Sequence, residues 1–496
     1  MENVDKRQLL QETTFGRRVA EEEIDALQSY FVETDQWQRI LSGDIDVVYG
    51  PKGSGKSAIY FLLLAREDEL FDRGILLVAA ENPRGTPAFK DLVEDPPTSE
   101  AEFRALWKLY LLSLIGRQFR DYKVEGDSAA RLIKELRDAN LLAENAGLSA
   151  MIRAALAYAR SLLRPKSIEG GLQLDPLTGM PSGIIGKITL AEPSAEEHAE
   201  GFISADELFR LADAALNVAG LKLWLVLDRL DVAFAESRDL EQNALRALFR
   251  VYVDNLGLNE VVLKIFLRDD LWRRITEGGF REASHITRSI TITWNDTSLL
   301  NLIIRRALQN AGLRDYYKVE EEAVLASVQA QQTLFYRMFP QQVEPGPAKP
   351  NTFNWMLGRT RDGTRRTAPR ELIHLLESVR AEQVRSLELG EPGPPGETLF
   401  TTSALKGGLP DVSRVRLEQT LFAEYPELKS RIEALERQKT EQSVASLAKL
   451  WRMEENEARG VAQKLVEVGF FEPRPGTDWV PFLYRDVLQM VQGLAG

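Results

Sequence analysis

The sequence predicts an α/β fold, in which a parallel sheet covered by helices is followed by a helical lid and a C-terminal winged-helix-like domain. Short aliphatic runs alternate with longer amphipathic segments through residues 1–296, and this alternation is typical of a parallel sheet covered by helices. A glycine-rich loop directly follows the first aliphatic run. Near the C-terminus, two short amphipathic segments precede a turn-rich stretch, which is the order of a winged helix.

The first strand and its loop organise the N-terminal region. Apolar residues recur at helical spacing in residues 18–41 and predict a helix there. Residues 44–49 are β-prone, and the glycine-rich loop of residues 50–57 follows them at once. We then expect an apolar helix over residues 58–69 and a buried strand over residues 75–80.

Two insertions separate this part of the sheet from the rest. Residues 97–164 are rich in Leu, Ala and Arg and are predicted to be all-helical. Turn signals in residues 165–193 surround short β-prone pieces, which predicts a hairpin or a flexible insertion. The sheet pattern then resumes with a helix at 205–220, a strand at 221–227, a helix at 241–256 and a strand at 260–267.

The chain becomes helical again after residue 296. Helices are predicted over residues 298–311, 320–335 and 370–383, and Pro/Gly-rich joints lie at 344–350 and 391–396. The second joint is the better boundary, so we predict three parts: an NTPase core over 1–296, a helical lid over 297–390 and a winged-helix-like domain over 397–496.

The winged-helix prediction depends on the order of the last segments. Helices are expected over residues 442–451 and 454–469, and residues 470–471, the turn at 473–476 and residues 479–484 form the wing. A small unrelated α+β cap is the alternative.

The glycine-rich loop matches the Walker A pattern G-x-x-x-x-G-K-[ST] and lies between a predicted strand and a predicted helix, which is the context that supports it. The glycines let backbone N–H groups converge on phosphate oxygens, and the following helix directs its N-terminus at the same oxygens. Lys56 would reach the β- and γ-phosphates, and Ser57 would bind Mg²⁺. The predicted ATP-binding residues are Gly50, Pro51, Lys52, Gly53, Ser54, Gly55, Lys56 and Ser57.

A P-loop also needs an acid on a neighbouring strand to hold the metal. The strand at residues 221–227 ends in Asp228, which fits a Walker B aspartate that binds Mg²⁺, usually through water. The usual Asp-Glu pair is missing because Arg229 follows Asp228. Asp231 is our candidate for polarising the attacking water, and the alternative is that it only caps the next turn.

Two arginines are candidates for sensing the γ-phosphate. Arg268 ends the strand after Walker B, where it would act as a sensor 1, or it would form a salt bridge with Asp269 or Asp270. Arg370 follows Pro369 in the first turn of a predicted helix and would neutralise γ-phosphate charge as a sensor 2. The alternative for Arg370 is a solvated position in a basic run.

These motifs together resemble the STAND/KAP and origin-recognition-like branch of additional-strand, AAA-type ATPases. The stretch Phe15-Gly-Arg-Arg-Val-Ala-Glu21 ahead of Tyr49–Ser57 resembles, more narrowly, a bacterial family of P-loop ATPases. The resemblance covers most of residues 10–390 and implies ATP hydrolysis in a nucleotide-dependent switch. Arg229 departs from the common Asp-Glu, which predicts slow turnover.

The amino-acid composition limits the metal sites, binding partners and cellular location that we expect. There are 0 Cys and 3 His, which excludes disulfides and thiolate zinc sites and disfavours a histidine metal site. The formal net charge of −12 disfavours nucleic acid as the main partner. The first 15 residues lack the apolar core of a signal peptide, and no run approaches the ~18 apolar residues of a membrane span. We therefore expect a cytoplasmic ATPase.

Three functions remain open. The first is a switch whose nucleotide state controls self-association or the binding of a protein effector, in bacterial defence or signalling. The second is a DNA-acting ATPase that uses the winged helix or the basic lid at residues 359–370. The third is a scaffold that binds ATP and barely hydrolyses it. Residues 420–496 contain ten basic and twelve acidic residues, a net charge of −2, which favours a protein partner for the winged helix.

Overall fold

The computed structural model describes residues 5–81, 96–144, 146–163, 187–230 and 237–495. The chain forms two compact units. The sheet unit consists of residues 35–51 and 56–292, and the C-terminal unit of residues 1–34, 52–55 and 293–496. The sequence analysis assigned residues 1–34 to the NTPase core, whereas in the structure they pack with the C-terminal part of the chain.

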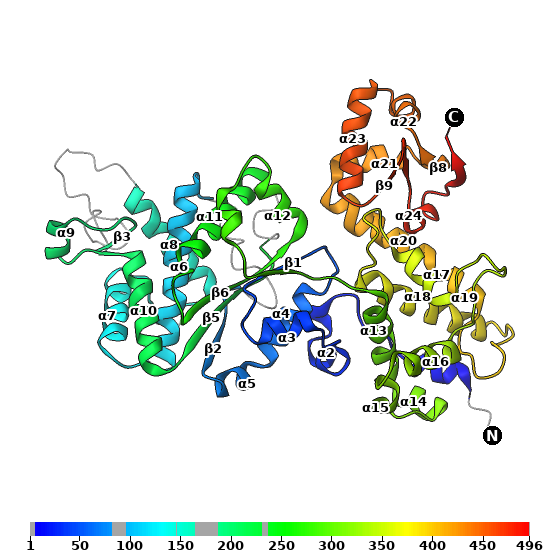
Figure 1. Ribbon diagram of the computed structural model, residues 1–496, viewed down its shortest axis with the longest axis horizontal. Coiled ribbons are helices and arrows are strands. Elements are labelled where there is room, and N and C mark those ends of the chain that lie inside the picture. The colour runs from blue at the N-terminus through cyan, green and yellow to red at the C-terminus, as the bar shows by residue number, and fades with distance from the viewer. Residues whose placement is uncertain (1–4, 82–95, 145, 164–186, 231–236, 496) are drawn as a thin grey trace. The chain divides into compact units, whose positions relative to one another are not determined.

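A five-stranded parallel sheet is the centre of the sheet unit (Figure 1). Its strands lie in the order β2-β5-β6-β1-β7, so that β6 separates β1 from β5. The predicted α/β fold with a parallel sheet is therefore correct. The strands are β1 (Val47–Gly50), β2 (Ile75–Ala79), β5 (Lys222–Leu227), β6 (Val261–Arg268) and β7 (Ser289–Thr291).

Helices cover both faces of this sheet. Figure 1 shows α11 (Arg238–Asp254) and α12 (Asp269–Thr276) on one face, and α3 (Asp35–Leu41) and α4 (Lys56–Ala65) on the other. The strands are buried on both faces, which explains why they read as continuous aliphatic runs rather than as alternating patterns. The remaining helices next to the sheet are α5 (Glu67–Asp72) and α10 (Ala205–Ala219).

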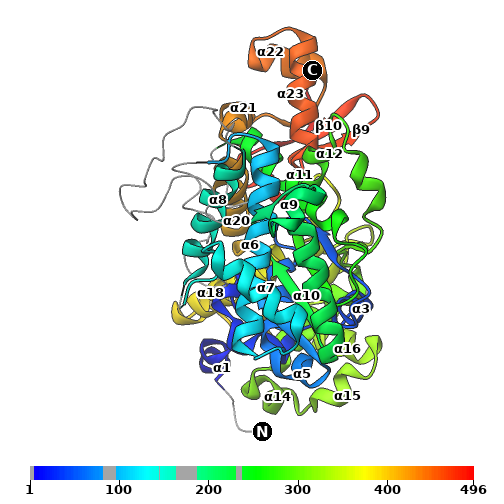
Figure 2. The same cartoon turned by 90° about the vertical axis from the view of Figure 1, so that its left-hand side faces the viewer.

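The predicted all-helical insertion is confirmed as three helices, α6 (Glu100–Asp121), α7 (Asp127–Asp138) and α8 (Leu148–Leu163) (Figure 2). Helix α6 is buried around most of its circumference. Its Trp107 Nε1 donates to Ala244 O at 2.9 Å, and its Tyr110 hydroxyl donates to Ala80 O at 2.7 Å. These bonds fix α6 against α11 and against the end of β2. Most of the predicted hairpin at 165–193 lies outside the described residues.

The C-terminal unit contains the lid and the winged-helix elements. Strand β8 (Lys439–Gln442), helices α22 (Val444–Trp451) and α23 (Glu455–Glu467) and the hairpin β9 (Glu472–Arg474)–β10 (Thr477–Trp479) follow one another as a winged helix requires. The wing ends earlier than predicted, because Pro481 starts helix α24 (Phe482–Arg485) where residues 479–484 were expected to be a strand. Strand β11 (Val491–Leu494) completes the small sheet.

The predicted helices at residues 18–41 and 320–335 are divided in the structure. The first consists of η1 (Ala20–Glu22), α2 (Ile24–Tyr30) and α3, and the second of α15 (Glu321–Leu325) and α16 (Val328–Met338). The other elements of the C-terminal unit are α1 (Lys6–Glu12), α13 (Asp296–Leu308), α14 (Ala311–Tyr317), α17 (Thr352–Thr360), α18 (Pro369–Glu388), α19 (Thr402–Gly407), α20 (Leu409–Arg416), the π-helix η4 (Leu417–Phe422) and α21 (Lys429–Glu433).

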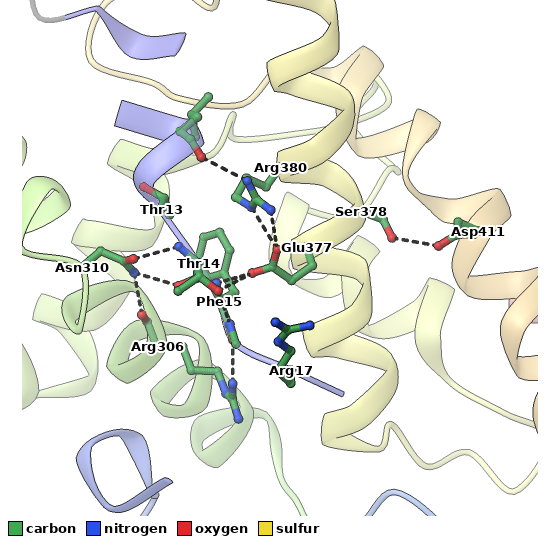
Figure 3. Close-up of polar contacts among 12 residues, drawn as sticks. Thr13, Thr14, Phe15, Arg17, Arg306, Asn310, Glu377, Ser378, Arg380 and Asp411 are labelled. Atoms are coloured by element: carbon green, nitrogen blue, oxygen red, sulfur yellow. Dashed lines mark hydrogen bonds and ion pairs between the residues drawn. The ribbon is translucent and has the colours of Figure 1, made fainter. Parts of the chain in front are cut away.

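The N-terminal segment at Thr13–Arg17 is held on the lid by charged side chains (Figure 3). Glu377 of α18 accepts hydrogen bonds from the Phe15 N–H and from Arg380. Arg306 of α13 donates to Phe15 O at 2.6 Å and forms a buried ion pair with Glu23 at 3.0 Å. These contacts explain why residues 1–34 belong to this unit and not to the sheet.

The lid is joined to the winged helix by a close backbone contact at Gly363. Its N–H donates to Gly469 O at 2.7 Å, and Arg365 beside it pairs with Glu472 of the wing at 3.0 Å. A Cβ on Gly363 would overlap the Phe471 carbonyl and lie 2.9 Å from Gly469 O. Only glycine therefore allows this approach. No helix among the residues that the structure describes is long and apolar enough to cross a membrane.

The first prediction concerns this contact. Gly363→Ala should lower the free energy of unfolding of the C-terminal unit by about 1–3 kcal/mol, because the added methyl group has no space. Thermal unfolding followed by circular dichroism measures the change. Gly460→Ala is the control, since a Cβ there meets nothing within 4 Å and the position lies in helix α23. If both variants melt like the wild type, the lid and the winged helix are not joined as described.

Candidate functional site

The glycine-rich loop connects β1 to α4, as predicted. Gly53 and Gly55 have φ values of +82° and +97°, in the left-handed region that favours glycine. Glycines at these two positions let successive N–H groups turn toward one point, which makes a concave anion-binding backbone. Lys56 and Ser57 are the first two residues of α4, so the positive end of the helix dipole is directed toward the same point.

The Lys56 ammonium folds back over its own loop. Its Nζ donates to Gly50 O at 2.8 Å and to Pro51 O at 3.0 Å. The side chain is half-buried and remains at the concave side of the loop, with flexible donors that a phosphate group can attract. This arrangement fits the role that the sequence predicts for Lys56.

Asp228 lies directly after β5, at the carboxyl edge of the sheet. Its exposed fraction is 4%, and the strand register continues so that it stands beside Phe266 of β6. Tyr60 of α4 packs against Phe266, with ring centroids 6.1 Å apart. Burial raises the pKa of the Tyr60 phenol, and the negative charge of Asp228 raises it further. The predicted Walker B aspartate therefore lies within electrostatic reach of the Walker A helix.

The donors at this edge suit a hard cation. Ser57 and Asp228 provide a hydroxyl and a carboxylate, and Mg²⁺ commonly takes only one or two protein carboxylates and completes its shell with phosphate oxygens and water. Within the described ranges, no cluster of three or more His, Cys, Asp or Glu residues could hold a metal by itself. The residues therefore fit a metal that arrives with a nucleotide, not a preformed metal centre.

Arg268 ends β6 as predicted, but its guanidinium is engaged. Its Nε donates to Asp270 Oδ1 at 2.9 Å and its second amino group donates to Oδ2 at 2.8 Å. This two-point contact is the salt bridge that the sequence analysis kept as the alternative. A sensor role would require this pair to open, so that role stays a prediction.

The predicted second acid, Asp231, lies outside the described residues. Arg229 precedes it with a φ of +58°, so the chain turns sharply as soon as it leaves β5. Sequence reasoning missed a different acid, Glu81, which follows β2 and has an exposed fraction of 1%. The sequence signal for Glu81 was an acidic residue directly after a predicted strand. Only the strand order shows that this strand is the neighbour of the strand that ends before Asp228.

The tip of the loop, residues 52–55, belongs to the C-terminal unit. Lys52 forms an ion pair with Glu424, and Trp294 Nε1 donates to Ser54 O at 2.8 Å. A Cβ on Gly53 would lie 3.0 Å from Arg370 Cβ. Lys52 is therefore engaged in an ion pair within the C-terminal unit.

Arg370 is the second residue of α18 and adjoins Gly53. Its Nε is buried and has no hydrogen-bond acceptor among the described residues. An unsatisfied buried donor costs about 1–3 kcal/mol. The guanidinium therefore has unused hydrogen-bonding capacity beside the phosphate loop, which is what a sensor 2 arginine needs.

Comparisons with known proteins give distant structural matches only. A scan of family models and a search of curated proteins found no match to this chain. Among solved structures, the chain is similar to the ORC2 protein of Aeropyrum pernix in its ADPNP–ADP complexes, with 14% identity, a TM-score of 0.29 and 98% of each chain covered. The ADP form of that protein matches at 12% identity, a TM-score of 0.30 and 97% of each chain.

The second prediction separates Arg370 from a structural arginine. Arg370→Ala should reduce the preference for ATP over ADP more than it reduces overall nucleotide affinity, because the γ-phosphate carries the extra charge. Calorimetric titration with each nucleotide in the presence of Mg²⁺ measures the two affinities. Arg385→Ala is the control, since that side chain lies on the same helix and is 71% exposed. Equal losses for ATP and ADP would make Arg370 purely structural.

Proposed function

We propose that this protein binds ATP·Mg²⁺ and hydrolyses it slowly, and that its nucleotide state controls self-association or the binding of a protein partner. One observation carries the proposal. A Walker A loop joins β1 to α4 in a parallel sheet where β6 separates β1 from the strand that ends in Asp228. This is the strand order of an additional-strand ATPase, and it supports the proposal because the loop and Asp228 both follow carboxyl ends of strands in one sheet.

Each donor has a separate task in this proposal. The loop N–H groups and Lys56 bind the β- and γ-phosphates, and Ser57 and Asp228 hold Mg²⁺. The metal supplies charge that stabilises the leaving ADP. The buried position of Asp228 strengthens its interaction with a cation, because the effective dielectric constant is lower there than in water.

A chain of polar contacts within the C-terminal unit supports the switch. Glu371 directly follows Arg370 and pairs with Arg416 at 2.9 Å, and Arg416 also pairs with Asp362 at 3.4 Å. These side chains are nearly buried, so breaking one pair would leave charges uncompensated. A change at Arg370 therefore affects the residues that hold the lid loop against the winged helix. Bacterial defence or signalling is the setting in which we place such a switch.

The third prediction tests nucleotide binding directly. Lys56→Ala should abolish the rise in melting temperature that ATP·Mg²⁺ causes in the wild type, because a ligand that binds only the native state stabilises it by mass action. Differential scanning fluorimetry with saturating nucleotide measures the shift. Lys134→Ala is the control and should keep the shift, because that side chain is 68% exposed on α7 and is no part of the loop. An unchanged shift in Lys56→Ala would overturn the P-loop assignment.

The alternative is a DNA-acting ATPase, and the surface chemistry disfavours it. Glu454, Glu455 and Glu457 are exposed at the start of α23, where a DNA reader would meet phosphates. In the basic lid segment, Arg359 pairs with Glu344 at 2.9 Å and lies over the Phe482 ring. Arg359 therefore contributes to structure within the unit, and Arg365 of the same segment pairs with Glu472.

The fourth prediction follows from this surface. The full-length chain should show no appreciable affinity for random duplex DNA near 150 mM salt, because duplex binding depends on phosphate neutralisation by a basic face. Fluorescence anisotropy with a labelled duplex, with and without ATP·Mg²⁺, measures it. Deleting residues 397–496 should instead change nucleotide-dependent oligomerisation in light scattering. Tight, salt-sensitive duplex binding would favour the DNA-acting alternative.

A further inference from the structure

The sheet unit lacks the usual second acid directly after Asp228, because Arg229 occupies that position. Additional-strand ATPases need a carboxylate that orients or deprotonates the attacking water. A water-activating group of this kind contributes about 10²–10⁴-fold to the rate. A second carboxylate at the same edge of the sheet would have to come from a neighbouring strand.

Strand register identifies that neighbour. Ala79 of β2 is paired with Val226 of β5, and the Ala80 N–H donates to Val226 O at 2.9 Å. If the same register continues for two residues past this pair, Glu81, which lies in the bend after β2, comes beside Asp228. Residues paired across parallel strands direct their side chains to the same face of the sheet. The two carboxylates therefore lie on neighbouring strand ends, where adjacent backbones are about 4.8 Å apart.

The same row of residues continues toward the phosphate loop. Val226 pairs with Lys264, so Asp228 stands beside Phe266, and Phe266 pairs with Val48 of β1. Glu81 and Asp228 thus share the sheet face on which Tyr60 packs against Phe266. This is the face of α4, the helix that begins with Lys56 and Ser57.

Electrostatics agrees with this placement. After burial, the largest influence on the Tyr60 phenol is the charge of Asp228 and the next is that of Glu81, and both raise its pKa. Glu81 also raises the pKa of Tyr110, whose hydroxyl donates to Ala80 O. The charge of Glu81 therefore acts on Tyr60 of α4, together with that of Asp228, and on Tyr110 of α6.

Packing alone does not account for an acid at this position. Glu81 has an exposed fraction of 1%, and burying an ionised carboxylate costs several kcal/mol before any partner offsets the cost. A carboxylate beside a metal-binding aspartate is useful when water must be oriented and deprotonated there.

We propose that Glu81 is the catalytic base of this protein and replaces the acid that Arg229 displaces from the Walker B motif. The inference rests on the proposed ATPase function. Glu81 accepts a proton from the attacking water, whose oxygen forms a bond to the γ-phosphorus. The bond from that phosphorus to the β–γ bridging oxygen breaks, its electron pair stays with ADP, and the proton leaves Glu81 for the released phosphate or solvent.

The fifth prediction tests this with the full-length chain. Glu81→Gln should lower ATP hydrolysis by at least about 10²-fold while the ATP·Mg²⁺ melting shift stays that of the wild type. Its second readout is the nucleotide that remains on the protein after incubation with ATP and desalting. Glu81→Gln should retain ATP, and the wild type should retain ADP. Glu69→Gln is the control, because that side chain is 50% exposed on α5 and should change neither readout.

A parallel Asp231→Asn variant decides between the two acids. Wild-type hydrolysis in Glu81→Gln, together with loss in Asp231→Asn, would overturn the proposal. If Glu81→Gln unfolds, Glu81→Asp is the second variant. It keeps the negative charge but shortens the side chain by one methylene, so the variant should bind ATP normally and hydrolyse ATP slowly. A wild-type rate of ATP hydrolysis in Glu81→Asp would also overturn the proposal. Absence of any ATP-dependent melting shift in the wild type would instead contradict the proposed function itself.

Discussion

The parallel direction of the five strands is the constraint on which the candidate site depends. Because every strand runs the same way, all the carboxyl ends meet at one edge, and residues far apart in sequence become neighbours there. Gly50 ends β1, Arg268 ends β6 and Asp228 follows β5. The insertion of β6 between β1 and β5 sets the spacing between the phosphate loop and the metal-binding acid. In the proposed site, Ser57 and Asp228 would hold Mg²⁺ together with phosphate oxygens.

Both units contain buried ion pairs, and in the C-terminal unit these pairs join segments that are far apart in sequence. Glu377, Arg306 and Glu23 hold the N-terminal segment, and Arg416 joins Glu371 to Asp362. Such pairs contribute little net stability but lose several kcal/mol when one partner is removed. They therefore favour one arrangement of lid, N-terminal segment and winged helix over others. They act beside a hydrophobic core that joins the same three segments, so the ion pairs select the arrangement and the apolar contacts stabilise it.

Local patterns predicted the sheet and the phosphate loop, because each strand and the Walker A motif are signalled by adjacent residues. The alternation of buried strands and amphipathic helices predicted the parallel sheet. Asp228 was predicted as the metal-binding acid because it directly follows a predicted strand. Long-range contacts could not be predicted in this way. Residues 1–34 pack with the C-terminal unit through Glu377 and Arg306, which lie hundreds of positions away. The wing ended early because Pro481 starts a helix after the strand, and β7 was too short to be detected.

The positions of Glu81 and Arg229 explain why the sequence alone does not predict the proposed catalytic acid. In sequence, Asp231 is the nearest acid to Asp228, and Glu81 is separated from it by well over a hundred positions. Chain proximity favoured Asp231, whereas the pairing of Ala79 with Val226 brings Glu81 to the edge of the sheet where Asp228 follows β5. The positive φ of Arg229 turns the chain away from the strand direction at the position where a Walker B glutamate would stand. Glu81 follows β2, so its position does not depend on how the chain continues after β5. A sharp turn after Asp228 is therefore compatible with a catalytic base at Glu81.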